Sequence, residues 1–179
     1  MDRFWFLTWT TYGVWLPGDE RGFVSRVREF KAIGPRVEHD LPGTPFDRDK
    51  PALKRAAIGQ LKGEPVRLTS PQAADALTEF QATAAYRGWD LLAAAVMANH
   101  VHLVVGVPGD PDPAKLLQVF KSYASRRLNA AYPRPKSGTW WTESGSRRKL
   151  ADETAVLSAM RYVANQEYPL ALFVRAVGE

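Results

Sequence analysis

The sequence contains no cysteine among its 179 residues and only three histidines. Disulfide bonds and thiolate metal sites are therefore excluded, so any bound metal ion must be held by histidine, carboxylate or amide side chains. The chain also lacks an apolar run of about 18 residues and a basic, cleavable N-terminal segment. We therefore expect neither a membrane span nor a signal peptide. We expect the protein to be cytoplasmic.

The composition is that of an ordinary globular protein, with 45% hydrophobic and 24% charged residues. The length predicts a single domain over residues 1–179. Residues 18–69 are rich in glycine, proline and charge, and we interpret them as an irregular excursion or insertion that includes a solvated His39. The 24 Lys and Arg against 19 Asp and Glu give a net charge of +5, which is compatible with a nucleic-acid partner.

The hydrophobic pattern alternates between strand and helix periods along the remainder of the chain. It predicts strands at 3–10, 89–97 and 100–107, a strand or β-loop at 139–150, and helices at 71–88, 113–131 and 152–165. Two adjacent strands between helices indicate an α+β fold, with a ferredoxin-like antiparallel sheet packed against helices.

The stretch AAAVMANHVHLVVGV, residues 93–107, places two of the histidines in an apolar run. Side chains of a strand alternate between its faces, so His100 and His102 point the same way and Val101 points to the other face. Two imidazoles in this arrangement can share one divalent cation. The structural alternative is a pair of histidines on the polar face of a half-covered sheet.

The helix that follows carries FKSYASRRLNA, residues 120–130, with Tyr123 at the edge of its apolar stripe. Such a tyrosine is commonly a core residue with a solvated hydroxyl. A phenol, with a pKa near 10, attacks phosphorus usefully only where a cation polarises the phosphate. Two clusters of cations are candidates for DNA binding: Lys121, Arg126 and Arg127 around the tyrosine, and Arg147, Arg148 and Lys149 further along.

These motifs resemble the single-tyrosine HUH transposases, especially the REP-associated tyrosine transposases. MANHVHLVV at 97–105 is close to the Met-Pro-Asn-His-Val-His-Leu pattern of that family. The opening TWTTYGVWLPGDERG at 8–22 and the spacing from His102 to Tyr123 add to the similarity. The resemblance covers the first strand and residues 70–165, but not residues 23–68.

The resemblance implies a ferredoxin-like sheet, with the two histidines on a central strand and the tyrosine on a neighbouring helix. It implies Mg²⁺ or Mn²⁺ held by His100 and His102, with Tyr123 as the nucleophile. The substrate it implies is single-stranded DNA beside a hairpin, cut through a 5′-phosphotyrosine bond and later rejoined. A homodimer that donates the tyrosine helix across its interface and a monomer are both compatible with the sequence.

One position departs from the family pattern, in which a Gln, Glu or Asn four residues after the tyrosine commonly supplies a third metal ligand. Here that position is Arg127, which cannot ligate a metal. Three interpretations stay open: Arg127 holds the phosphate or favours phenolate; another side chain among Gln118, Asn129 and Glu143 is the ligand; or catalysis has been lost. The last of these describes a domesticated hairpin-binding protein without cleavage activity.

Overall fold

The computed structural model describes residues 1–16, 19 and 51–176. In this part a five-stranded sheet has the strand order β4-β1-β3-β2-β5, and every neighbouring pair is antiparallel. The strands are β1 (Arg3–Thr10), β2 (Asp90–Val96), β3 (His100–Val107), β4 (Ser146–Leu150) and β5 (Ala171–Val174). The helices are α1 (Pro51–Gly59), α2 (Ser70–Arg87), α3 (Pro113–Ala131) and α4 (Glu153–Ala164).

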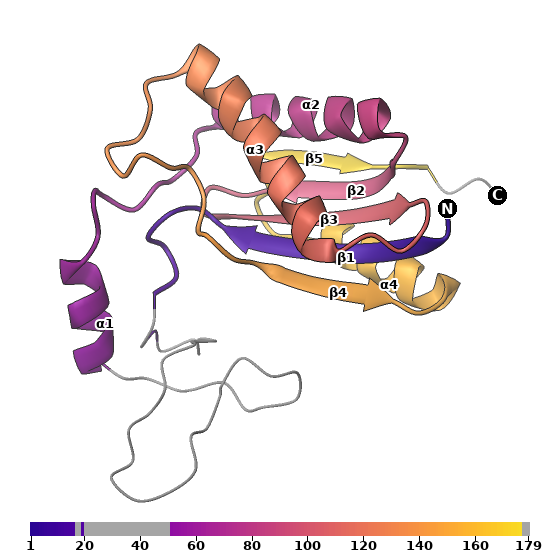
Figure 1. Ribbon diagram of the computed structural model, residues 1–179, viewed down its shortest axis with the longest axis horizontal. Coiled ribbons are helices and arrows are strands. Elements are labelled where there is room, and N and C mark those ends of the chain that lie inside the picture. Colours follow the sequence, from indigo (N-terminus) through magenta and orange to yellow (C-terminus); the bar gives the residue numbers. More distant parts are fainter. Residues whose placement is uncertain (17–18, 20–50, 177–179) are drawn as a thin grey trace, which may run out of the picture.

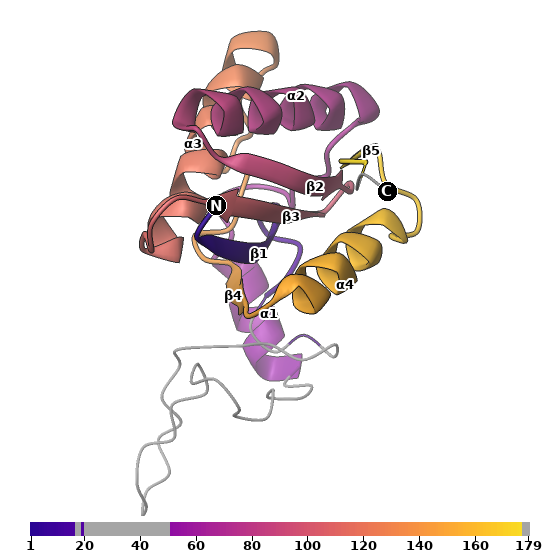
Figure 2. The ribbon, with the colours of Figure 1, turned by 90° about the vertical axis from the view of Figure 1, so that its right-hand side faces the viewer.

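The helices cover both faces of the sheet. Leaving α1 aside, the chain runs β1-α2-β2-β3-α3-β4, which is the ferredoxin-like order, and α4 and β5 follow it. Figure 2 shows α2 and α3 on one side of the strands and α4 on the other side. The predicted α+β fold with a ferredoxin-like sheet is confirmed. α1 has no buried residue and lies away from the sheet (Figure 1).

Strand alternation divides the core between the two faces. On β1, Trp5, Leu7 and Trp9 point toward α2 and α3, where they pack in the larger cluster with Phe80 and Phe120. Phe4 and Phe6 point the other way, toward the smaller cluster beneath α4. The residues that α4 contributes to that cluster recur at helical spacing: Val156, Ala159, Met160 and Val163.

Helix boundaries follow local capping. The carboxylate of Asp112 accepts a hydrogen bond from the backbone of Ala114 at the start of α3, and Asp152 does the same for Ala155 in α4. At the other end of α2, Gly88 adopts a left-handed conformation with φ of 65°, which ends the helix. None of the helices in the described part of the chain has the length and apolar character needed to span a membrane.

Two elements differ from those that the sequence pattern predicts. α1 lies within the 18–69 segment that we interpreted as irregular, although residues 20–50 of that segment, with His39, lie outside the described residues. β5 was not predicted, because it is only four residues long and its alternate residues are half-buried. Of the predicted 139–150 strand or β-loop, only Ser146–Leu150 forms a strand.

Candidate active site

The two histidines lie side by side on the face of the sheet that α4 covers. His100 is the first residue of β3, and His102 follows on the same face. Their ring centroids are 4.8 Å apart with an interplanar angle of 80°. The common orientation predicted from strand alternation is therefore present, at a separation that lets both rings approach one ion.

Each imidazole is held through its Nδ1 atom. Nδ1 of His102 lies 2.8 Å from the hydroxyl oxygen of Thr8, which is paired with it across β1 and β3. Nδ1 of His100 lies 2.7 Å from the side-chain oxygen of Asn99. Nδ1 of each imidazole thus has a polar side-chain neighbour.

His102 is buried, with 6% of its surface exposed. Burial, followed by the proximity of His100, lowers the pKa of His102 to about 4, from an ordinary value of 6.5. The imidazole is therefore neutral near pH 7, which is the protonation state that a metal ligand requires.

A tyrosine from α4 completes this group of side chains. The ring of Tyr162 meets the ring of His102 edge-on at 5.2 Å and the ring of Phe6 at 5.7 Å. Tyr162 is 52% exposed, so one side of its ring contacts the histidine while the other side is open to solvent. The helix presents it there because Val163 and Ala159, which flank it on the apolar stripe, are buried against the sheet.

Sequence reasoning missed Tyr162, although a signal for it is present. Gln166 stands four residues after Tyr162 and donates a hydrogen bond from its side-chain amide to the Tyr162 carbonyl oxygen at 3.0 Å. This is the residue type and spacing that the family pattern describes, and that Arg127 fails to provide after Tyr123.

Tyr123 lies on the opposite face of the sheet from the histidines. α3 packs through Phe120 and Ala124 in the cluster that it shares with α2, whereas the histidines face α4. The guanidinium of Arg126 lies 4.7 Å from the Tyr123 ring centroid, and that of Arg87 lies 5.8 Å away. Within one chain, the structure does not bring Tyr123 to the histidines.

The amino-acid sequence matches a known protein family over more than half of its length. The family model described as "Transposase IS200 like" matches residues 65–166, more than half of the chain. The chain belongs to the IS200-like transposase family. The matched residues include both histidines, Tyr123 and Tyr162, whereas β1 precedes them.

Two solved structures are similar to this IS200-like transposase. A REP-associated tyrosine transposase bound to a REP hairpin has 12% sequence identity and a TM-score of 0.48, over 90% of this chain and 64% of that one. A candidate transposase from Deinococcus radiodurans R1 has 18% identity and a TM-score of 0.45, over 93% of this chain and 92% of that one. The chain thus spans less than two thirds of the first of these proteins. No curated protein matches the sequence.

The predicted DNA-binding cations of this transposase fall into different environments. Lys121 is buried, and its ammonium donates hydrogen bonds to three backbone carbonyls. Arg127 donates two hydrogen bonds to Asp75 on α2, at 2.9 and 2.6 Å. Lys121 is thus enclosed by the protein, whereas Arg127 is paired with Asp75 although 40% of its side chain is exposed. The guanidinium of Arg126 stacks on Tyr123, on the face away from the histidines.

The second cluster divides between the two faces of β4. Arg148 is paired with Phe6 across β1 and β4, and its guanidinium lies 5.3 Å from the Phe6 ring centroid. The Phe6 ring is in turn stacked on His102, with centroids 5.5 Å apart. Arg147 and Lys149 point to the other face, where Lys149 lies over the Trp5 ring. Arg148 is therefore the predicted cation nearest to the histidines.

Among the alternative third ligands, Gln118 and Asn129 both lie on α3, and Asn129 accepts a hydrogen bond from the indole of Trp140. Glu143 lies in the loop before β4. No three His, Asp or Glu side chains gather as a metal-ligand set in the described part of the chain. Among the described residues, a third protein ligand beside the two histidines would therefore be of another residue type.

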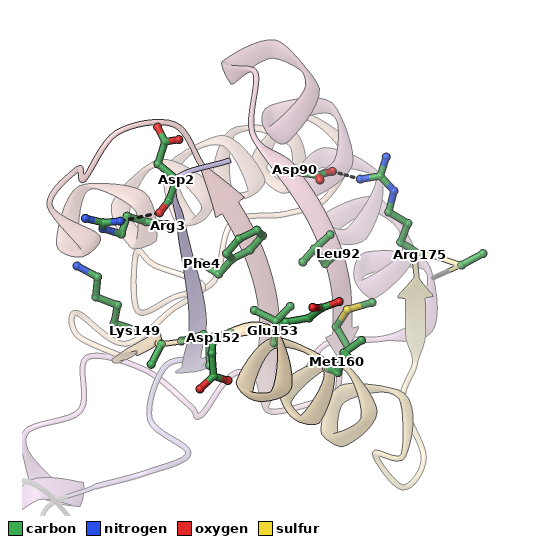
Figure 3. Close-up of a pocket in the computed structure, with 15 residues that line it drawn as sticks. Asp2, Arg3, Phe4, Asp90, Leu92, Lys149, Asp152, Glu153, Met160 and Arg175 are labelled. Atoms are coloured by element: carbon green, nitrogen blue, oxygen red, sulfur yellow. Dashed lines mark hydrogen bonds and ion pairs between the residues drawn. The ribbon is translucent and has the colours of Figure 1, made fainter. Parts of the chain in front are cut away.

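A hollow of about 900 Å³ lies at the opposite end of α4 from Tyr162. Figure 3 shows Phe4, Leu92 and Met160 in its apolar floor and charged side chains around its rim. The cations on this rim are already paired, Arg175 with Asp90, and Lys149 and Arg3 with Asp110 outside the hollow. Neither histidine nor Tyr162 lines the hollow, so it does not belong to the histidine site.

Proposed function

We propose that this transposase cuts and rejoins single-stranded DNA beside a hairpin, with Tyr162 as the nucleophile. The observation that carries the proposal is the 5.2 Å edge-on contact between the Tyr162 and His102 rings. A nucleophile and a metal site that act on one phosphate must lie on the same surface. Tyr162 meets this condition within one chain, and Tyr123 does not.

The proposed metal ligands are His100 and His102 through Nε2, and Gln166 through its side-chain oxygen. Two neutral imidazoles and an amide oxygen are donors that first-row divalent cations accept, and phosphate oxygens can complete the coordination. When bound, Mg²⁺ or Mn²⁺ supplies Lewis-acid polarisation of the scissile phosphate. The hydrogen bond from Gln166 to the Tyr162 carbonyl keeps the ligand and the nucleophile on one turn of chain.

In the cleavage step, the Tyr162 hydroxyl oxygen forms a bond to phosphorus and the bond between phosphorus and the 3′ oxygen breaks. The phenolic proton is replaced by phosphorus on the tyrosine, and the departing 3′ oxygen gains a proton. The products are a 5′-phosphotyrosine and a free 3′-hydroxyl. Attack by a 3′-hydroxyl reverses the step and joins the strand, which regenerates the tyrosine.

Arg148 and Phe6 extend the same surface toward β4. The guanidinium over Phe6 places a permanent positive charge one aromatic ring away from His102. We assign Arg148 to contact DNA phosphates next to the cut, and Arg147, Lys149 and Arg126 to weaker, longer-range attraction. Lys121 and Arg127 are assigned to stabilise the fold, because the Lys121 ammonium is buried on backbone carbonyls and the Arg127 guanidinium is paired with Asp75.

Covalent trapping tests the proposal. A labelled pool of single-stranded oligonucleotides, each with a hairpin and randomised flanks, is incubated with the protein and Mn²⁺ and resolved on a denaturing gel. We expect an adduct with the wild type and with Tyr123→Phe, and none with Tyr162→Phe. Mass spectrometry of the adduct should place the phosphotyrosine at residue 162.

An adduct on Tyr123, or an adduct that survives Tyr162→Phe, would show that the wrong tyrosine has been chosen. Mixing the Tyr162→Phe and His102→Ala proteins distinguishes a site within one chain from a site shared between two chains. An adduct should form in the mixture only if one copy supplies Tyr162 and the other copy supplies His102. Hairpin binding without an adduct at any position would instead identify the domesticated DNA-binding protein.

A further inference from the structure

The hydrogen-bond partners at Nδ1 of the two imidazoles differ in whether they determine which ring nitrogen carries the proton. The partner of His100 is the side-chain oxygen of Asn99, at 2.7 Å. An amide oxygen accepts hydrogen bonds and never donates them. A hydrogen bond between these atoms therefore requires the proton to be on Nδ1 of His100. In a neutral ring, Nε2 then carries the lone pair.

The partner of His102 is the hydroxyl of Thr8, at 2.8 Å, which can donate or accept. If the hydroxyl accepts, Nε2 of His102 carries the lone pair, as in His100. If it donates, Nε2 carries a proton and cannot ligate a metal. Only the accepting arrangement gives the two neighbouring rings, 4.8 Å apart, matching lone pairs.

Packing restricts how the His102 ring can turn. Phe6 is stacked on it at 5.5 Å with an interplanar angle of 16°, and Tyr162 meets its edge. Thr8 and Phe6 stand on the same face of β1, next to one another along that face. The strand therefore supplies both a flat support for the imidazole and its hydrogen-bond partner.

We propose that Asn99 and Thr8 are positioning residues that hold the imidazoles of His100 and His102 with the proton on Nδ1, so that both Nε2 atoms face the metal. This inference rests on the proposed function for the identity of the ligands. Partners of this kind fix the tautomer and orientation of a ligating histidine, and their loss typically weakens metal binding by about 10–100-fold.

The tautomers are read directly in the metal-free, DNA-free protein by two-bond ¹⁵N–¹H correlation NMR at a pH where the rings are neutral. The chain has three histidines, so each imidazole can be assigned by substitution. In the wild type we expect a protonated Nδ1 and an unprotonated Nε2 for both residues. Asn99→Ala should convert His100 into a mixture of tautomers, and Thr8→Val should do so for His102.

Matched variants separate positioning from packing. Asn99→Asp and Thr8→Ser keep an acceptor oxygen at each position and should keep the wild-type tautomers. By calorimetry, Mn²⁺ affinity should fall about 10–100-fold in Asn99→Ala and Thr8→Val, change by less than about threefold in Thr8→Ser, and not fall in Asn99→Asp, whose added negative charge favours a cation. Thermal unfolding of the four variants confirms that each is folded before binding is compared.

A wild-type His100 that is protonated on Nε2 would overturn the proposal, as would wild-type tautomers and Mn²⁺ affinity in Asn99→Ala. These outcomes are separate from failure of the proposed function. Protein that never forms a DNA adduct would refute nucleophilic cleavage, yet its NMR spectrum would still report the state of each imidazole.

Discussion

Replacing Lys121 by methionine tests how the loop before β4 is held. The ammonium of Lys121 donates to the carbonyl oxygens of Thr142 at 2.7 Å, Glu143 at 3.3 Å and Ser144 at 2.8 Å. Methionine keeps most of the apolar stem of this side chain, which is only 8% exposed, and removes the three donors. The substitution therefore isolates the polar contribution.

Two opposing effects determine how much Lys121→Met lowers the free energy of unfolding. A hydrogen bond from a charged group is worth about 1.5–3 kcal/mol, and three carbonyls lose their donor together. Burial of the ammonium costs several kcal/mol in the wild type, and that cost also disappears. Because Glu143 and Ser144 are exposed, their carbonyls can turn to water. We expect a net loss of about 2 kcal/mol, or roughly 4–8 °C in Tm.

The pH dependence of the free energy of unfolding provides a second test of the role of Lys121. Burial first, and then the charge of Arg147, lower the pKa of Lys121 to about 8 from 10.5, while the charge of Glu143 opposes the change. Between these values the unfolded chain binds a proton that the folded chain has released. The free energy of unfolding should therefore rise with pH in this window, by up to about 1.4 kcal/mol per pH unit from this group.

Urea unfolding followed by tryptophan fluorescence, at several pH values from 7 to 10.5, measures both effects. Lys115→Met is the matched control, because Lys115 is an exposed lysine on the same helix. It should change the free energy of unfolding by less than about 0.5 kcal/mol and leave its pH dependence intact. A Lys121→Met protein as stable as this control, with an unchanged pH dependence, would refute the reasoning.

Two further perturbations address the α2–α3 contact and the DNA surface. Asp75 accepts hydrogen bonds from Arg127 and from Tyr132, and Tyr132 first and Arg127 second lower the pKa of Asp75. Asp75→Asn should lower the free energy of unfolding by about 1 kcal/mol near pH 7, measured by urea unfolding. The difference between the variant and the wild type should vanish as acid protonates the wild-type carboxyl. A difference that persists in acid would contradict the ionic origin of the effect. Reversing Arg147 and Arg148 to Glu should weaken binding of single-stranded hairpin DNA and reduce the slope of log K against log salt by at least about 0.7, the contribution of the one phosphate contact assigned to Arg148, in fluorescence anisotropy titrations. An unchanged slope would exclude both arginines from the DNA surface.

Strand periodicity was enough to predict the shared face of His100 and His102. Period-two alternation decides which side chains are neighbours before any tertiary contact is known. The order of elements likewise predicted the ferredoxin-like sheet, because strands that alternate with helices have few ways to pack.

Helical periodicity was not enough to show which tyrosine lies beside the histidines. The apolar stripe that includes Phe120 and Ala124 predicts that one side of α3 is buried, but it does not predict which face of the sheet α3 covers. α3 follows α2 onto one face, and α4 covers the histidines on the other face. The spacing from Tyr162 to Gln166 is present in the sequence. Only the structure shows that α4 covers the face of the sheet on which the histidines of β3 lie.

The long-range pairing of β1 has a consequence for biosynthesis. Thr8 leaves the ribosome early, yet its partner His102 is 94 residues away, and Tyr162 is made later still. Such non-local contacts form slowly, and chains grow by only about 5–20 residues per second. A nascent or truncated chain that ends before α4 therefore has both histidines but neither Tyr162 nor its helix. Incomplete copies of this protein would be unable to cut DNA by the proposed route, so production of the whole chain acts as a check on activity.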